Sequence, residues 1–213
     1  ERTGTSAFDK SGNANTGTLT AGPTWANGKF GGAVNLDGTD DYVSVVDSTS
    51  LRPSNITISA WVRIAPGAAG TVRVLSKGKN TARDYNIGKQ GGATPKLTFF
   101  YYNSGGTLQL WESTSSWATL IPDNTWKHIA VTYESASGSS LKMYVDGVSV
   151  AGSWTSGNGN SALNFSAEPV RIGSSMWTDT LAEFFKGYLE DVKIYNYART
   201  NKQVVEDMNG GNP

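Results

Sequence analysis

Apolar and polar residues alternate along most of this chain. Between Ile56 and Ile64 every second residue is apolar, and the same period of two recurs in Trp126–Tyr133 and Ser140–Val145. Strict alternation is typical of β-strands that turn one face toward a core. The same reasoning predicts further strands at Val34–Leu36, Tyr42–Val46, Arg73–Lys77, Tyr85–Lys89, Lys96–Asn103, Thr107–Ser113, Val170–Gly173 and Phe185–Asn196.

Turn residues separate the predicted strands. Asp146-Gly147 stands between two apolar runs, which is the strongest short-range signal for a β-hairpin. Ser104-Gly105-Gly106 joins two further strands in the same way. Ten or more short strands with no helical period between them predict an all-β fold, in which two antiparallel sheets pack face to face as a jelly-roll sandwich.

One short helix is predicted near the C-terminus. Thr200 is a suitable N-cap, and Gln203 three residues later completes a capping box. Val204, Val205 and Met208 supply an apolar side, and Gly210-Gly211 ends the helix.

Composition narrows the classes of function. The chain has 213 residues, with 18 basic and 18 acidic side chains, and no cysteine. A neutral chain has no electrostatic reason to bind nucleic acid. No run of 18 apolar residues occurs, so membrane insertion is not expected. The absence of cysteine excludes disulfides and thiolate metal sites.

Six phrases follow one another in a fixed order, and together they resemble the laminin-G-like, concanavalin A-like jelly-roll family. They are DKSGNANTG, GKFGGAVNLDGTDDYV, ITISAWVR, TWKHIAVTY, LKMYVDGV and GYLEDVKIYNYA. The resemblance implies one laminin-G-like domain over residues 1–213, secreted or displayed at a cell surface. Most of the family's opening strand is missing before Glu1, so we expect a module excised or processed from a larger protein.

The first phrase is a candidate Ca²⁺ site. Its loop carries Asp9, Asn13 and Asn15 among glycines, and a hard cation takes six to eight oxygen ligands. The family resemblance implies that Asp191 of the last long strand lies near this loop. A turn satisfied by its own Asx side chains is the alternative. A second acidic run is either another cation site or a solvated turn; it contains Asp37, Asp40 and Asp41.

Aromatic residues outside the family phrases are candidates for a sugar-binding surface. Sugars present C–H groups on their faces, which suit aromatic rings, and hydroxyls that suit neutral polar groups. If Leu108 and Leu110 face the core, Trp111 lies on an open sheet face. Trp154 and Trp177 are expected in loops at the rim. The predicted ligand-binding residues are Trp111, Trp177, Tyr102, Gln109 and Trp154. The alternative is that these rings fill the undersides of loops.

No matched pair of acids for bond cleavage is apparent. Glycosidases need two carboxyl groups across the scissile bond, and related sandwich glucanases carry them in a Glu-x-Asp-x-x-Glu strand. That phrase is absent, and Glu190 and Asp191, as neighbours in a strand, point to opposite faces. His128, the sole histidine, has no motif around it and is interpreted as structural.

The sequence therefore predicts a non-catalytic carbohydrate-binding module that binds a polysaccharide or other glycan, with a structural calcium ion. The first alternative is a protein-interaction or adhesion domain with a protein partner. The second is an unrecognised hydrolase or lyase that uses loop carboxylates. Which glycan is bound does not follow from the residues.

Overall fold

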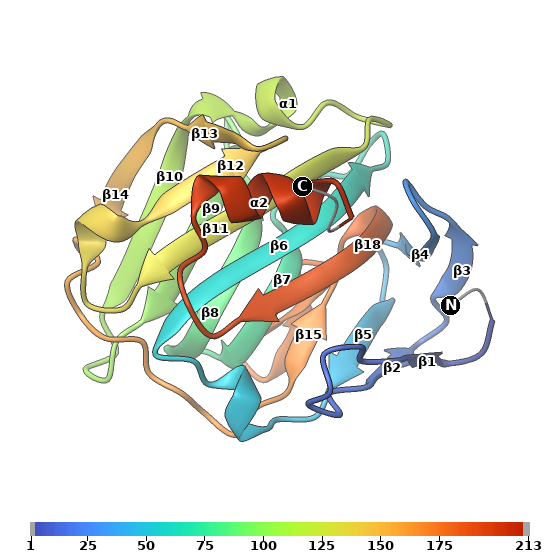
Figure 1. Cartoon of the computed structure of the whole chain (residues 1–213), viewed down its shortest axis with the longest axis horizontal. Helices are drawn as coiled ribbons and strands as arrows, with labels where there is room; N and C mark the ends of the chain where they lie inside the picture. Colours follow the sequence, from blue (N-terminus) through green and yellow to red (C-terminus); the bar gives the residue numbers. More distant parts are fainter. Residues whose placement is uncertain (1–2, 211–213) are drawn as a thin grey trace.

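Two antiparallel sheets pack face to face in the computed structural model, which describes residues 3–210. Figure 1 shows these layers one behind the other, with helix α2 lying across the front of the smaller sheet. The larger sheet has the strand order β1-β2-β5-β15-β7-β8-β9-β10-β14, and the smaller one β13-β12-β11-β6-β18-β4-β3. The jelly-roll sandwich expected from the sequence is therefore confirmed.

The strands of the larger sheet are β1 Ser6–Ala7, β2 Gly17–Thr20, β5 Tyr42–Val45, β7 Val72–Lys79, β8 Ala82–Gln90, β9 Lys96–Tyr102, β10 Leu108–Ser116, β14 Gly152–Ser156 and β15 Val170–Ile172, with β16 Ser175–Trp177 and β17 Thr180–Ala182 as a side hairpin. Those of the smaller sheet are β3 Thr24–Asn27, β4 Gly32–Asp37, β6 Asn55–Ile64, β11 Lys127–Glu134, β12 Lys142–Val145, β13 Val148–Val150 and β18 Lys186–Tyr195. The helices are η1 Thr49–Leu51, α1 Trp117–Leu120, η2 Gly138–Ser140 and α2 Asn201–Met208.

The core lies between the sheets, where the alternating residues meet. In the smaller sheet Ile58 of β6 pairs with Val131 of β11, and both are fully buried. Across the core, Ile87 and Phe99 pair between β8 and β9 of the larger sheet. Directly opposed residues on neighbouring strands share one face, so each pair extends the apolar layer.

Each strand predicted from alternation is present, with small shifts at its ends. The strand β13 completes the hairpin expected at Asp146-Gly147. The short strands β1, β2, β3, β14, β16 and β17 were not predicted. Two of them carry Trp154 and Trp177, which were expected in loops. Runs of two to five residues hold too few alternations to show a period.

The predicted C-terminal helix is α2, and its capping box is formed by Thr200 and Gln203. Val204 packs beneath it against Ala130 and Tyr144 on the outer face of the smaller sheet. Gly211, named above as part of the helix end, lies outside the described residues, as does Glu1. No helix between residues 3 and 210 is both long and apolar enough to cross a membrane.

Candidate functional site

Trp111 faces the core, so the expectation of an open Trp111 face is wrong. Its side chain is 5% exposed and belongs to the main apolar cluster, whereas Leu108 and Leu110 are only half-buried. The cause is the pairing of β10 with β9, which sets Trp111 opposite the fully buried Phe99. Because opposed residues share a face, Trp111 follows Phe99 inward.

Gln109 and Trp154 are also engaged inside the protein, which corrects their assignment as ligand-binding residues. The Gln109 side-chain oxygen accepts hydrogen bonds from the backbone N–H groups of Asn158 and Gly159, at 3.1 and 3.0 Å. The Trp154 indole donates to the Gly138 carbonyl at 2.9 Å, and its ring packs against the core. Neither side chain is free to meet a sugar.

Trp177 and Tyr102 lie together at the surface of the larger sheet. The Trp177 side chain, in the hairpin of β16 and β17, is 48% exposed. With Tyr102 from β9 it lines a shallow pocket of about 140 Å³. The guanidinium carbon of Arg83 lies 4.4 Å from the Trp177 ring centre and supports the ring from below. A supported ring with a free face is the arrangement that stacking on a sugar requires.

The Asp9 loop satisfies its own carboxylate. Ser11 donates from its backbone N–H to one carboxylate oxygen of Asp9, at 2.8 Å, and from its hydroxyl to the other. The backbone N–H of Asn15 donates to that second oxygen at 2.9 Å. Burial raises the pKa of Asp9, but these hydrogen bonds outweigh it and hold the pKa below its usual value. The Asx turn, given above as the alternative to a cation site, is therefore present.

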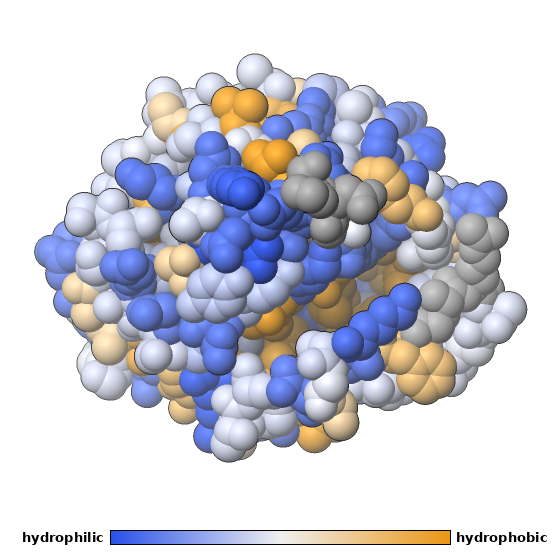
Figure 2. Space-filling view, viewed as in Figure 1, coloured by the Kyte–Doolittle hydropathy of each residue, from blue (hydrophilic) through white to orange (hydrophobic). Residues whose placement is uncertain are grey.

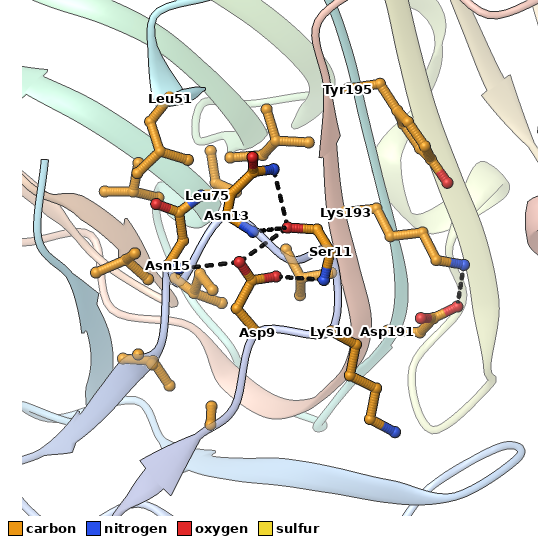
Figure 3. A pocket seen from close by; sticks show the side chains of 18 of the residues that line it. Asp9, Lys10, Ser11, Asn13, Asn15, Leu51, Leu75, Asp191, Lys193 and Tyr195 are labelled. Carbon is orange, nitrogen blue, oxygen red and sulfur yellow. Dashed lines mark hydrogen bonds and ion pairs between the residues drawn. The ribbon is translucent and has the colours of Figure 1, made fainter. Parts of the chain in front are cut away.

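The four predicted cation ligands do not form a cage. Figure 3 shows Asp191 turned toward Lys193, with which it forms an ion pair of 2.6 Å, rather than toward Asp9. The Asn15 side-chain oxygen accepts from the Ser48 hydroxyl at 2.7 Å, and the Asn13 amide donates to Ser11. The side-chain oxygens of Asp9, Asn15 and Asp191 thus face protein donors, and as these residues lie they do not fit the oxygen shell that Ca²⁺ needs.

Three carboxylates of the second acidic run do converge. One oxygen each from Asp37, Asp40 and Asp41 lies within 4.8 Å of the others. Asp41 is buried and accepts the Asp37 backbone N–H at 3.0 Å. Burial raises the pKa of Asp41; the hydrogen bond opposes that shift, and the charges of Asp37 and Asp40 add to it. Asp37 and Asp40 are exposed, as expected for a solvated turn.

A groove of about 1080 Å³ opens between the sheets beside the C-terminal half of β18. Figure 2 shows apolar residues at the bottom of this hollow and hydrophilic ones around its rim. Its apolar lining includes Val45, Leu51, Val192 and Ile194. The sequence did not predict this groove, because its walls come from segments far apart in the chain.

Glu190 holds the turn before β4. Its carboxylate accepts hydrogen bonds from the backbone N–H groups of Lys29, Phe30 and Gly31, the last at 2.6 Å. A Cβ atom at Gly28 would lie 2.3 Å from the same carboxylate, so a larger residue there would push Glu190 away from these donors. The turn phrase GKFGG and Glu190 are 160 residues apart, and their contact could not be read from either.

Comparison with known proteins identifies the chain. The family model described as the Concanavalin A-like lectin/glucanases superfamily (Laminin_G_3) matches residues 37–205. The chain belongs to this superfamily. Mouse (Mus musculus) pappalysin-1 is 24% identical to this concanavalin A-like domain over 187 residues, which are 83% of the chain and 11% of that relative's length. The domain thus spans about a tenth of that relative.

Solved structures share the fold of this concanavalin A-like domain. Domain 4 of AbnA, a GH43 extracellular arabinanase from Geobacillus stearothermophilus, in complex with arabinotriose, is 20% identical with a TM-score of 0.63; the match covers 90% of this chain and 87% of that one. The binding domain of botulinum neurotoxin DC in complex with rat synaptotagmin II is 14% identical with a TM-score of 0.65, covering 97% and 51%. At such identities the likeness concerns the fold alone.

Proposed function

We propose that this domain is a non-catalytic carbohydrate-binding module of an extracellular or cell-surface protein. The observation that carries the proposal is Trp177, whose ring is half-exposed and stacked on Arg83 beside Tyr102. The ring offers an apolar face to the C–H groups of a sugar, and the neighbouring Asn80 and Thr81 offer hydrogen bonds to its hydroxyls. The arabinotriose bound to the related AbnA domain supports a glycan as the ligand.

Replacing Trp177 with alanine tests the proposal. We expect Trp177→Ala to weaken retention on a bound glycan by about tenfold, which corresponds to roughly 1.4 kcal/mol of lost stacking. The measurement is affinity electrophoresis through gels that contain single polysaccharides. Phe30→Ala is the matched control: it also removes an exposed aromatic ring, 61% accessible, but from the turn before β4 and not from the Trp177 pocket. Equal migration of Trp177→Ala and the unmodified protein in every retaining gel would contradict the proposal. Reducing-sugar release in the same panel would instead reveal a hydrolase.

Binding of Ca²⁺ at the predicted ligands is a further proposal. It requires the Asp9 carboxylate to give up its three hydrogen-bond donors and to bind the ion instead. On this proposal the melting temperature rises in millimolar CaCl₂ and falls with chelator, and Asp9→Asn removes the response. Asp41→Asn is the parallel variant for the second acidic run. Identical melting curves with calcium and with chelator would end the calcium proposal.

Strand addition to the groove is a second candidate function, in which the partner is an extended protein segment. Between residues 3 and 210, β4 pairs with β18 only from Lys186 to Leu189. Beyond Leu189, β18 pairs with β6 on one side, and no strand of the described chain pairs with its other edge. Such an edge offers backbone hydrogen bonds to an added strand, and an apolar floor receives alternate side chains. The groove therefore favours a segment with every second residue apolar.

A matched pair of peptides tests strand addition. One peptide of about seven residues alternates valine and threonine. The other has proline in place of the threonines, which removes every second backbone donor. We expect only the first to bind, and to slow hydrogen exchange at the amides of Asp191–Tyr195. Ile194→Lys places a charge in the groove and is expected to abolish the effect. Equal behaviour of the two peptides would exclude this function.

A further inference from the structure

Two arginines lie buried side by side on the outer face of the larger sheet. Arg73 of β7 is 2% exposed and Arg83 of β8 is 1% exposed. Their guanidinium carbons lie 4.8 and 5.5 Å from the ring centre of Phe100 on β9. Trp177 covers Arg83 from the other side. The aromatic rings hold both planar cations in place, with much of their hydration removed.

One carboxylate serves both arginines. Glu183 lies 2.9 Å from Nε of Arg73 and 3.8 Å from Nη1 of Arg83, and these are the ion pairs that either arginine makes within residues 3–210. The 3.8 Å contact is too long for a hydrogen bond, so Arg83 is the under-paired member. Burial lowers the pKa of Arg73 to about 10, and the neighbouring positive charge of Arg83 adds to that shift while Glu183 opposes it. One positive charge of the pair is left without its own counter-ion.

Buried polar groups next to the arginines also lack partners. Asn86 is fully buried, and neither the nitrogen nor the oxygen of its amide has a hydrogen-bond partner among the described residues. The same holds for Nε of Arg83. Asn86 is directly opposite Phe100, so its amide lies on the face that carries the guanidinium groups. Buried polar groups are normally hydrogen-bonded, so this cluster is fitted to receive a further polar group.

The segment over the cluster is held mainly by side chains. The hairpin of β16 and β17 has one backbone pairing with the sheet, Met176 with Lys79. It is further held by the Lys79–Asp179 ion pair at 2.9 Å and by Arg83, whose Nη2 donates to the Met176 carbonyl at 3.1 Å. Thr178, Asp179 and Glu183 adopt positive φ angles of 45°, 60° and 57°. Left-handed backbone at non-glycine residues is strained, and strain of this kind favours a segment that can change conformation. Displacement of Trp177 with this hairpin would uncover Arg83.

We propose that Arg83, supported by Arg73 and Asn86, binds the carboxylate of an acidic sugar, so that the glycan recognised by this domain is a polyuronate. The inference rests on the proposed glycan function and adds the class of sugar. A uronate carboxylate presents two oxygens in a plane, which match the paired donors of a guanidinium. It supplies the negative charge that Glu183 alone does not, and Trp177, once displaced from Arg83, stacks on the sugar ring. Glu183 competes with the ligand for the same cations.

Charge on the sugar can be varied without changing its ring. Oligogalacturonate and its fully methyl-esterified form are compared by calorimetry. We expect the acidic form to bind about tenfold more tightly, and its affinity to fall between about 50 and about 500 mM NaCl. Arg83→Gln is expected to bind both forms equally. Glu183→Gln frees both arginines and is expected to tighten binding of the acidic form only. Glu168→Gln is the control, because Glu168 pairs with Arg171 and Lys79 instead.

A thermal-shift assay covers the case in which Arg83→Gln does not fold. Sodium glucuronate should raise the melting temperature of Glu183→Gln more than that of the unmodified protein, relative to NaCl at equal ionic strength. Equal affinity for acid and ester, with no effect of Glu183→Gln, overturns the inference and leaves the glycan function standing. If neither form binds and no polysaccharide gel retains the protein, the proposed function is overturned; a glucuronate shift then still supports the carboxylate site, and no shift overturns it as well.

Discussion

Replacing Trp111 with alanine is expected to lower the free energy of unfolding by about 4 kcal/mol, because removal of a buried indole loses its transfer free energy and leaves a cavity. Trp111 is 5% exposed, pairs with Phe99, and belongs to the main apolar cluster. The strand β14 packs tightly on the ring as well, since a Cβ at Gly152 would lie 2.3 Å from it. Urea denaturation at neutral pH gives the difference directly.

Trp177→Ala is the matched comparison, since it removes the same side chain from the surface. Its expected loss of stability is within about 1 kcal/mol, the order of the stacking on Arg83. The two tryptophans should therefore behave in opposite ways: Trp111→Ala loses stability and keeps glycan retention while folded, and Trp177→Ala does the reverse. A stable Trp111→Ala protein that no longer binds glycan would show that the ring is not a core residue.

The fold could be predicted because its longest strands carry their own pattern. Ile56–Ile64 shows four full alternations, and β6 with this period became the centre of the smaller sheet. The helix α2 was equally predictable, because its capping box depends only on Thr200 and Gln203, three residues apart. Features decided by a few residues in one segment are those that alternation and capping rules detect.

The direction in which β10 faces could not be predicted from the strand alone. Both of its faces are apolar enough to be buried, with leucines on one side and Trp111 on the other. The pairing register with β9 determines which face of β10 is buried, and β9 itself carries aromatic residues on both faces. Shifting a strand by one residue turns every inward-facing side chain outward and every outward-facing one inward. Three of the five predicted sugar contacts were misplaced for this reason or because Trp154 belongs to a short strand.

Trp177 and Tyr102 were predicted as ligand-binding residues, but the arginine cluster beside them remained hidden because it joins distant segments. Glu183 meets Arg73 across 110 residues, and Trp177 of β16 covers Arg83 of β8. The sequence showed Glu183 as an isolated acid and the arginines as ordinary polar positions of two strands. Only the register of β7, β8 and β9 places these groups on one face. Long-range pairing of this kind has no local signature in a single chain.

Stability is expected to fall by about 3 kcal/mol as the pH drops from about 6.5 to about 4, through His128 alone. His128 is 1% exposed, and burial lowers its pKa from 6.5 to about 4; the negative charge of Asp207 opposes the shift and Lys193 adds to it. Between these pH values the unfolded chain binds a proton that the folded chain does not, so acid favours unfolding. Above pH 6.5 and below pH 4 the contribution is constant.

His128→Gln separates this effect from the carboxylates. Asp9 and Glu168 have lowered pKa values, so their stabilising contributions fade as the pH falls through their ordinary values of 3.8 and 4.5, and they do so equally in both proteins. Asp41 has a raised pKa, so the folded chain binds its proton first and stability rises as the pH falls. Asp41 therefore cannot account for a loss of stability in acid. Urea midpoints measured between about pH 7 and about pH 4 should therefore fall steeply for the unmodified protein and remain nearly level for His128→Gln. Parallel pH profiles for the two proteins would mean that His128 is protonated, or reached by water, in the folded state.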